Sequence, residues 1–382
     1  MRTSADAVIV GGGIIGMAVA FYLSRAQYGR IILVEKEPLP GAGATSKAAG
    51  GIRAQFSTAV NIQMSMLSEK EFAGFKDVTG YDALFDRVGY MFLLEDEGDI
   101  QRFKKSYDLQ RSMGLEVELL KPEDISRHAP HVSLNGIGAA TFCKEDGLGD
   151  PHEFLSGYEK AARKQGVEIE FDTEVTGFEE INGRISTVKT TQGDISCPLV
   201  IDCAGPHSRL IGQMVGADVK VEPVRRQIVT TGELDFVEAY FPMVVDVKSG
   251  LYFHKESRGL LLGWADMSVK PSFDISIDPD YTDAILEKAL DRIPKLEQAE
   301  MANQWAGLYE TTPDHHAIIG YEPSLSGMFH VTGFSGHGFM HAPAAGMITA
   351  EILTGRKPPL DISGLSPERF TAGRTMEETN VI

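Results

Sequence analysis

Three glycines near the beginning of the chain have the spacing of a phosphate-binding turn. Gly11, Gly13 and Gly16 directly follow the apolar residues 7–10 and precede a second apolar stretch, residues 17–23. The first glycine permits a tight turn, the second lets the backbone approach a pyrophosphate, and the third lets a helix pack closely on a strand. The N–H groups at the start of such a helix carry about half a positive charge. They are therefore suited to bind the pyrophosphate of a dinucleotide.

An acidic residue completes this arrangement. The apolar residues 31–34 end at Glu35, close to the offset of about 20 residues at which an acid hydrogen-bonds a ribose hydroxyl. The order of strand, glycines, helix, strand and acid predicts a dinucleotide site rather than a βα turn that binds nothing. Glu35 does not distinguish NAD from FAD, because both contain an adenosine ribose with a free 2′-hydroxyl.

The next stretch, residues 38–56, is rich in Gly, Ala, Ser and Thr and has little apolar periodicity. A nicotinamide enzyme would continue here with further βα repeats. This stretch cannot build a core, but it can lie along an extended ligand and offer backbone N–H groups and the hydroxyls of Thr45 and Ser46. The alternative is a flexible surface loop.

A second glycine-rich turn lies near the other end of the chain. Residues 328–332 are predicted to form a strand, residues 333–338 a turn, and residues 342–353 a helix of small residues. A reduced flavin carries negative charge at N1 and the C2 carbonyl, which N–H groups at a helix start stabilise. A nicotinamide needs no such site. This turn therefore favours FAD over NAD.

Further elements are needed to position these turns. The pattern predicts a helix-rich stretch at about 60–127, a helix followed by strands between 152 and 178, a hairpin turning near Gly193-Asp194, a buried run at 199–202, and a helix opened by Ala204-Gly205. Residues 221–309 alternate short β-like runs with a helix near 281–292, which predicts a mixed sheet in a separate lobe. From about residue 355 periodicity is lost, which predicts a loosely held C-terminus.

Composition excludes several other classes. The formal net charge is −18 and no basic run is present, so nucleic acid is an unexpected partner. Cys143, Cys197 and Cys203 form no CxxC motif, which predicts neither a disulfide framework nor a zinc site, and favours a reducing compartment. The pair His315-His316 has no third-ligand motif, so no metal is expected. Residues 1–23 show neither a signal pattern nor a membrane span, and we expect a cytoplasmic protein, with peripheral membrane contact left open.

The motifs together resemble one known family over nearly the whole chain and in order. They are the glycine turn with Glu35, "GATS" at 43–46, "DCAG" at 202–205, "TPD" at 312–314 and "GFSGHGF" at 333–339. They are similar to those of the FAD-dependent amine oxidoreductases of the D-amino acid oxidase superfamily. Within it, "GGIRAQF" at 50–56 is most similar to the β subunits of sarcosine oxidase and of dye-linked L-proline dehydrogenase.

The resemblance implies an α/β fold of the glutathione-reductase-2 type. An FAD-binding Rossmann-like domain would be assembled from residues 1–85, 148–220 and 310–370. A substrate lobe with a mixed or antiparallel β-sheet would comprise residues 86–147 and 221–309. Residues 371–382 would form a loose tail.

The resemblance also assigns the cofactor contacts. The pyrophosphate and ribose end would be held by Gly11, Gly13, Ile14, Ile15, Gly16, Glu35 and Lys36. The flavin would be lined by Thr45, Ser46, Gly50 and Gly51, with Val175 at the adenine and Ala204 and Gly205 covering the far side. The flavin pyrimidine edge would lie against Gly336, His337, Gly338, Phe339 and Met340.

The implied reaction is oxidation of a small secondary or N-methyl amino acid, similar to sarcosine or proline. A hydride would pass from the carbon next to nitrogen to flavin N5, leaving an imine that water hydrolyses. Arg53 is the candidate carboxylate or flavin-face residue, and Tyr252 and Tyr309 the candidates for the substrate cavity. The alternatives without a role in the site are a solvated arginine at a loop end and two half-buried tyrosines of the core. An oxidase of glycine or D-amino acids and an electron-relay subunit with partner subunits also remain open.

Three positions depart from the monomeric sarcosine oxidase pattern. Gly307 stands where that family has the cysteine bonded to its flavin, which predicts noncovalent FAD. Met340 stands in place of a second carboxylate-binding lysine. Leu261 stands in place of a lysine that helps oxygen accept electrons, which favours a dehydrogenase over an oxidase unless Lys255 or Arg225 supplies the missing charge.

Overall fold

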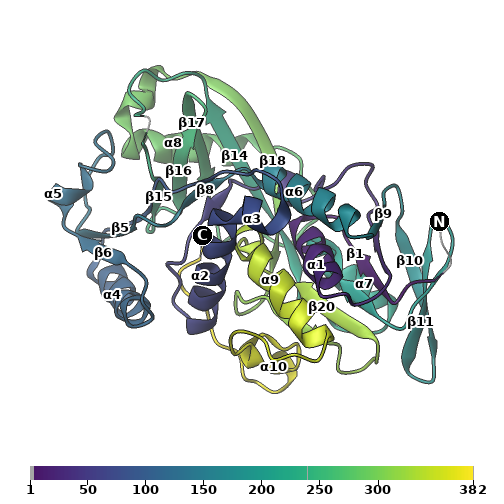
Figure 1. Cartoon of the computed structure of the whole chain (residues 1–382). Helices are drawn as coiled ribbons and strands as arrows, with labels where there is room; N and C mark the ends of the chain where they lie inside the picture. Colours follow the sequence, from purple (N-terminus) through teal and green to yellow (C-terminus); the bar gives the residue numbers. More distant parts are fainter. Residues whose placement is uncertain (1–3, 239, 382) are drawn as a thin grey trace.

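The glycine turn and Glu35 lie at the carboxyl ends of neighbouring strands in a six-stranded sheet (Figure 1). The computed structural model describes residues 4–238 and 240–381. The strand order is β19–β20–β13–β1–β2–β9, with strands Ile318–Tyr321 (β19), Met328–Thr332 (β20), Val200–Asp202 (β13), Ala7–Val10 (β1), Ile31–Val34 (β2) and Glu168–Glu170 (β9). All neighbours are parallel except β19, which is antiparallel to β20. The strands predicted from the apolar runs are therefore confirmed.

Both faces of this sheet are covered, which explains why its strands read as continuous apolar runs. Ile9 and Leu33 pack against one side, which carries the helices Ile14–Arg25 (α1), Pro151–Lys164 (α6) and Gly338–Leu353 (α9). Val8 and Val34 pack against the other side. That side carries the helix Ser208–Met214 (α7) and the antiparallel strands Val175–Ile181 (β10), Arg184–Thr190 (β11) and Ile195–Ser196 (β12).

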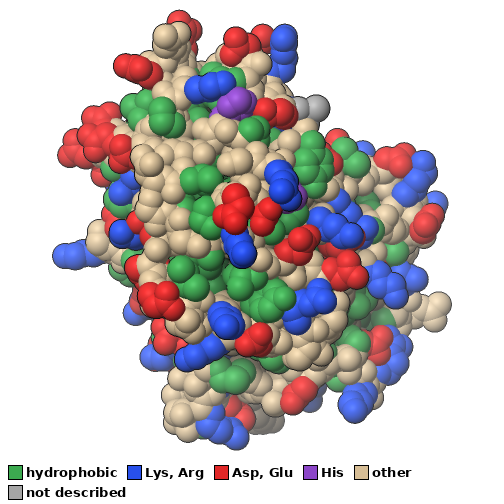
Figure 2. Space-filling model, turned by 90° about the vertical axis from the view of Figure 1, so that its left-hand side faces the viewer, with side chains coloured by type: hydrophobic (Ala, Val, Ile, Leu, Met, Phe, Trp, Pro, Cys, Tyr) green, Lys and Arg blue, Asp and Glu red, His purple; other side chains and the backbone are tan. Residues whose placement is uncertain are grey.

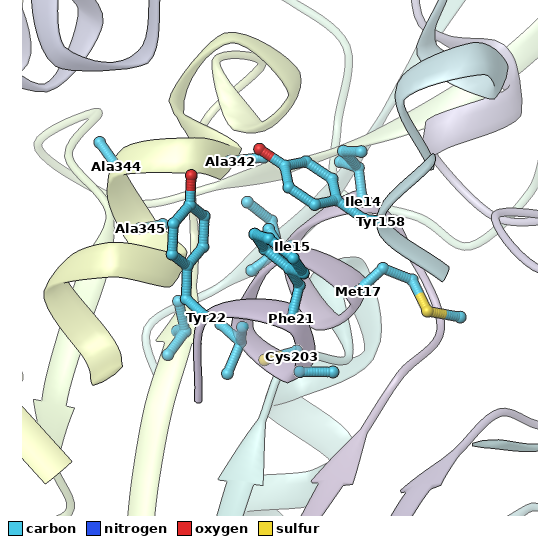
Figure 3. Close-up of a cluster of buried hydrophobic side chains, with 14 of the residues drawn as sticks. Ile14, Ile15, Met17, Phe21, Tyr22, Tyr158, Cys203, Ala342, Ala344 and Ala345 are labelled. Carbon is cyan, nitrogen blue, oxygen red and sulfur yellow. The ribbon is translucent and has the colours of Figure 1, made fainter. Parts of the chain in front are cut away.

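Helices α1 and α9 lie side by side, so the two predicted ligand-facing helix starts belong to one packed unit. Figure 3 shows Ile15 and Tyr22 of α1 next to Ala345 of α9, with Tyr158 of α6 beside them. Small residues allow this close approach. A Cβ on Gly346 would lie 2.8 Å from the carbonyl oxygen of Ala18, so a larger residue there would separate the helices.

The second large sheet has eight strands and is mixed, as predicted. Its order is β18–β14–β17–β16–β15–β5–β7–β6, and all neighbours are antiparallel except β15 and β5. The strands are Met301–Thr311 (β18), Glu222–Thr231 (β14), Gly259–Trp264 (β17), Leu251–Glu256 (β16), Met243–Asp246 (β15), Tyr90–Leu94 (β5), Ala139–Cys143 (β7) and Val117–Leu120 (β6). The domain boundaries given above remain a prediction.

The two faces of this sheet have different roles. One face packs Val229 and Leu262 against the helix Pro279–Arg292 (α8) and the turn Pro122–Ile125 (α5). The opposite face carries Ile228, Tyr252 and Leu261. Trp305 of this face donates its indole N–H to the carbonyl of Lys47 at 3.2 Å. This second face is therefore the one turned toward the glycine-rich stretch of residues 38–56.

The remaining elements correct one expectation. The stretch 60–127 is not continuously helical: it contains the helices Ala59–Ala73 (α2), Phe75–Thr79 (α3), Glu97–Ser112 (α4) and α5, separated by Phe85–Asp86 (β4), β5 and β6. The short apolar run of β5 is buried throughout and has no two-residue alternation, so periodicity does not distinguish it from a buried helix. Short elements complete the fold, namely Gly51–Ile52 (β3), Gly147–Gly149 (β8), Glu368–Thr371 (α10), Thr45–Lys47 (η1), Gly205–His207 (η2), Pro294–Gln298 (η3) and Ser363–Leu365 (η4).

The prediction of a loose tail is wrong for residues 378–380. The side chains of Glu378 and Asn380 are fully buried. Glu378 accepts hydrogen bonds from the backbone N–H groups of Ser57 and Thr58, at the start of α2, and from the amide of Asn61. A carboxylate at a helix N-terminus is stabilised by the helix dipole. Tertiary contacts thus order a segment that has no periodicity of its own.

Three further features concern the surface, the lengths of the helices and the grouping of possible metal ligands. On the face drawn in Figure 2, acidic and basic side chains are interspersed, with hydrophobic side chains between them. Within residues 4–238 and 240–381, no helix combines the length and apolar character required to cross a bilayer. In the same part of the chain, no three His, Cys, Asp or Glu side chains gather in a group that could hold a metal ion.

Candidate functional site

The glycine turn is too crowded for side chains. Gly11 has a φ of +111°, and a Cβ there would lie 2.4 Å from the carbonyl oxygen of Cys203. A Cβ on Gly16 would lie 1.9 Å from the carbonyl oxygen of Gly11. Gly13 precedes α1 and provides no side-chain cap, while Ile14 donates its N–H to the hydroxyl of Thr45 at 3.0 Å. The turn therefore offers backbone atoms, and no side chains of its own glycines, to a bound ligand.

Glu35 folds back over this turn. One carboxylate oxygen accepts the N–H of Gly12 at 2.5 Å, and the other accepts the N–H of Glu37 at 2.9 Å. The ammonium group of Lys36 lies 3.2 Å from the ring of His207 in η2, which begins at Gly205. The structure thus brings the predicted ribose-binding acid next to the second strand-to-helix turn.

The predicted adenine side is assembled from three distant segments. Val175, the first residue of β10, is buried in one cluster with Val10 and Val34, and Ala204 packs against that cluster. The N–H of Thr173 donates to the carbonyl of Glu35 at 2.8 Å. Val175, Glu35 and Ala204 therefore lie at the same edge of the six-stranded sheet.

The second helix start lies against the predicted substrate tyrosines. Gly336 has a φ of +94°, and a Cβ there would lie 2.5 Å from the ring of Tyr309. His337 precedes α9, which begins at Gly338. No side chain caps the start of this helix, and its first turn contains no acidic residue. Phe339 and Met340 belong to the first turn of this helix and are buried. The uncapped N–H groups of α9 fit an anionic ligand edge.

A comparison with known protein families shows which dinucleotide binds at these two helix starts. Residues 6–352 match the family described as FAD dependent oxidoreductase. The chain belongs to this family. The match spans both helix starts, Glu35 and most of both large sheets, so FAD rather than NAD is the cofactor, as predicted. The resemblance stated from the motifs is confirmed.

Individual relatives agree over nearly the whole chain. FAD-dependent oxidoreductase domain-containing protein 1 of Xenopus laevis is 29% identical over 99% of this chain and 85% of its own length. Mitochondrial dimethylglycine dehydrogenase of Mus musculus is 28% identical over 99% of this chain, which spans 46% of that protein. The crystal structure of L-proline dehydrogenase from P. horikoshii has a TM-score of 0.92 at 29% identity, covering 98% of this chain and all of that one.

The segment between Thr45 and Gly51 connects the two ends of the FAD site. Ser46 lies in η1 and donates its N–H to the carbonyl of Gly41 at 2.9 Å. Gly50 has a φ of +77°, and a Cβ there would lie 2.5 Å from the carbonyl oxygen of Gly149. A Cβ on Gly51 would touch the ring of Tyr90 at 3.3 Å. The glycines let this segment pass between α1 and the eight-stranded sheet, which a flexible surface loop would not do.

Arg53 lies at the end of this segment and is fully buried, which excludes the solvated alternative. Its guanidinium lies 3.9 Å from the ring centre of Phe56 and donates to the carbonyl of Gln55 at 2.9 Å. Asp146 holds this backbone in place by accepting the N–H of Ala54 at 3.1 Å and the amide of Gln55 at 2.9 Å. Burial raises the pKa of Asp146 to about 6. Among the residues that the structure describes, the Nε atom of Arg53 has no hydrogen-bond partner.

The C-terminal segment forms one wall of the cavity beside Arg53. The second terminal nitrogen of Arg53 donates to the carbonyl of Asn380 at 2.6 Å. The cavity has a volume of about 110 Å³. Its lining is Phe92, Arg102, Phe103, Val245, Val247, Gly250, Ala265, Met267, Thr379, Asn380 and Val381. Residues far apart in the sequence thus enclose the space next to the predicted carboxylate-binding group.

Tyr252 and Tyr309 lie on the same face of the eight-stranded sheet, and their place in a substrate cavity remains a prediction. Each phenol perturbs the pKa of the other, and burial raises both pKa values, so both side chains are neutral. A Cβ on Gly263 would lie 2.1 Å from the ring of Tyr252, so this glycine makes room for the ring. The imidazole of His337 is also neutral, because burial and the charge of Arg53 lower its pKa.

Two functional candidates were missed from the sequence. Arg226 is buried with its guanidinium 5.2 Å from the ring centre of Tyr309. Glu310 accepts the N–H of Gly333 and the hydroxyl of Thr332, each at 2.8 Å, and burial raises its pKa to about 7. No motif marks either residue. The two-residue alternation of the predicted strand would have placed Arg226 on the same face as Ile228.

Noncovalent FAD remains a prediction, and the geometry at Gly307 supports it. A Cβ on Gly307 would lie 2.5 Å from the Cβ of Lys47, so this position does not accommodate a cysteine side chain without movement. All three cysteines of the chain are buried elsewhere. Acid precipitation of the purified protein is expected to leave a colourless pellet and a yellow supernatant. A pellet that keeps the yellow colour after washing would show a covalent bond.

Proposed function

We propose that this enzyme oxidises a small secondary or N-methyl amino acid to its imine. The observation that carries the proposal is Arg53, a fully buried guanidinium whose Nε has no partner among the described residues and which contacts Asn380 in the lining of a cavity. A buried cation without an acidic partner is costly unless a ligand supplies the negative charge. The carboxylate of an amino acid supplies it, and an arginine fork binds a carboxylate with two hydrogen bonds.

The residues of this site act mainly by placement. Arg53 holds the carboxylate, and the stacked ring of Phe56 and the carbonyls of Gln55 and Asn380 hold Arg53. Tyr252 and Tyr309 are neutral and lie on the same face of the eight-stranded sheet, so they add no charge next to the substrate amine. FAD, when bound, accepts the two electrons and the hydrogen lost from the carbon next to nitrogen. Fixing that carbon in one orientation is the contribution of the protein.

An anaerobic substrate screen tests this proposal. The purified holoenzyme is mixed with sarcosine, N,N-dimethylglycine, L-proline, glycine and D-alanine, and the loss of oxidised-flavin absorbance is followed by stopped flow. We expect rapid bleaching by a secondary or N-methylated amino acid and slow or no bleaching by glycine and D-alanine. Absence of bleaching by every amine, with bleaching by dithionite intact, would instead favour an electron-relay subunit.

We further propose that the electron acceptor is a carrier other than oxygen. Leu261 lies on the FAD-facing side of the sheet with Tyr252. Opposite it in the register is His254, whose pKa is lowered by burial. The two cations expected to compensate lie elsewhere: Arg225 bonds Ser276 and Asp278 on the far side of the sheet, and Lys255 alternates with His254 onto that side. Leu261 therefore provides no charge of its own to stabilise superoxide as it forms, and neither Arg225 nor Lys255 takes its place on this face.

Reoxidation kinetics test the acceptor. Enzyme reduced by substrate is mixed with air-saturated buffer or with a dye acceptor, and we expect the dye to react much faster than oxygen. Leu261→Lys is expected to increase the rate with oxygen by about tenfold to a hundredfold, because a nearby positive charge stabilises the forming anion. Leu261→Met is the matched control and should change neither rate. Fast reoxidation of the unmodified enzyme by oxygen, with stoichiometric peroxide, would contradict the proposal.

A further inference from the structure

Four arginines are buried in the described part of the chain, and they fall into two classes. Arg292 is 6% exposed and pairs with Asp246 at 2.7 Å and Glu95 at 2.8 Å. Arg369 is 2% exposed and pairs with Asp314 at 2.7 Å. Arg53 and Arg226 are 0% and 7% exposed, and within residues 4–238 and 240–381 neither has a carboxylate partner.

The partners of the second class carry no negative charge. Arg53 donates to two carbonyls, while Arg226 donates to the carbonyl of Arg225 at 3.0 Å and lies 3.9 Å from the sulfur of Met267. The Nε atoms of both arginines are buried and have no hydrogen-bond partner within the described part of the chain. The chain therefore neutralises its structural buried arginines with its own acids and leaves these two uncompensated. Such charges are costly to keep unless a ligand neutralises them.

Both unpaired guanidiniums contact residues that line the same cavity, although neither lines it itself. Phe92 and Asn380 line it and contact Arg53, while Met267 lines it and contacts Arg226. Tyr309 connects them, because both positive charges lower the pKa of its phenol. The pyrophosphate site is formed by Gly11 to Gly16 at the other helix start, so the phosphates of FAD do not account for either charge.

From this charge balance we infer that Arg226 binds a second carboxylate of the substrate, which is therefore an N-substituted amino dicarboxylic acid. Arg53 holds the carboxylate next to the amine and Arg226 holds the distal one. The inference rests on the proposed function and specifies its substrate. The oxidation itself is unchanged: the C–H bond next to nitrogen breaks, a hydride goes to FAD, the amine becomes an imine, and both carboxylates leave intact.

Matched substrates test the inference on the unmodified holoenzyme. N-methylalanine, N-methylaspartate, N-methylglutamate and N-methylasparagine are compared by anaerobic flavin bleaching, with both enantiomers of each. We expect kcat/KM for one of the two diacids to exceed that for N-methylalanine and for the neutral amide by about tenfold to a hundredfold, as one charge-assisted hydrogen-bonded pair provides. Bleaching by monoacids and diacids at equal rates overturns the inference and leaves the proposed function standing. Bleaching by no amine contradicts the proposed function itself.

Variants separate the two guanidiniums. Arg226→Gln is expected to lower the ratio of kcat/KM for the diacid to kcat/KM for N-methylalanine by about tenfold or more, mainly through KM for the diacid. Arg226→Lys should restore part of the preference. Arg225→Gln is the matched control, since its side chain faces α8, and should retain it. Flavin content and circular dichroism check the folding of each variant. If Arg226→Gln weakens monoacids and diacids equally, Arg226 serves a single carboxylate or the flavin, and the inference fails.

Discussion

Gly11→Ala is expected to yield a protein that is purified largely without flavin. Gly11 has a φ of +111°, and a Cβ would lie 2.4 Å from the carbonyl oxygen of Cys203, so the backbone of the turn must move. Backbone strain of this kind costs about 1–3 kcal/mol, and the displaced N–H groups no longer meet the pyrophosphate. Titration of the apoprotein with FAD should show an affinity loss of at least about a hundredfold.

Gly43→Ala provides the control for this substitution. Gly43 lies in the glycine-rich stretch of residues 38–56, but no described atom lies within 4 Å of its Cβ position and its φ is not in the left-handed region. Its flavin content and thermal stability are expected to match those of the unmodified protein. A Gly11→Ala protein that keeps FAD equally well would show that the turn tolerates a side chain, against the geometry described here.

Arg53→Ala is expected to weaken flavin reduction by substrate and to leave FAD bound. A charge-assisted hydrogen bond to a carboxylate contributes about 1.5–3 kcal/mol, which corresponds to a loss of about tenfold to a hundredfold in kcat/KM. Arg53→Lys keeps the charge without the fork, so it should recover part of this loss. Stopped-flow bleaching and the flavin-to-protein absorbance ratio measure the two properties separately.

A substitution in the C-terminal segment provides a second variant for this test. Glu378→Gln weakens the contacts at the start of α2 that hold Asn380 against Arg53. We expect a smaller rise in KM than for Arg53→Ala, with kcat and FAD content nearly unchanged. If Arg53→Ala emerges as apoprotein while Glu378→Gln behaves normally, Arg53 belongs to the cofactor site rather than to the substrate site.

The parts of the fold that could be predicted from the sequence depend on local physics. The apolar run before Gly11, the three glycines and Glu35 each impose a requirement on the backbone within a few residues. The helix at 338–353 was predicted four residues too short at its start, because glycine and histidine carry weak helix signals. Strand β5 was missed because its burial comes from neighbours far away in the sequence.

The substrate side was predicted less completely, because its residues are brought together only by tertiary structure. Arg53 and the two tyrosines were found through a family resemblance, and their roles remain predictions. Arg226 carries no motif, and its significance comes from the absence of an acidic partner within the described residues. The role of Glu378 arises from a contact with Thr58, which is distant in sequence and leaves no periodic pattern.

The strand order of the six-stranded sheet has a consequence for how the protein is made. Strand β1 has β13 as a neighbour, and β13 in turn has β20, so three segments separated by long stretches of chain are interleaved. Contacts this distant in sequence form late and slowly during folding. While the chain is still on the ribosome, the glycine turn emerges early, beside a strand edge whose partner has not been synthesised, and that edge is open to wrong pairing. Capture of FAD therefore waits until residue 338 and the helix after it have been translated, and a nascent chain interrupted earlier has a nucleotide-binding turn without a flavin pocket.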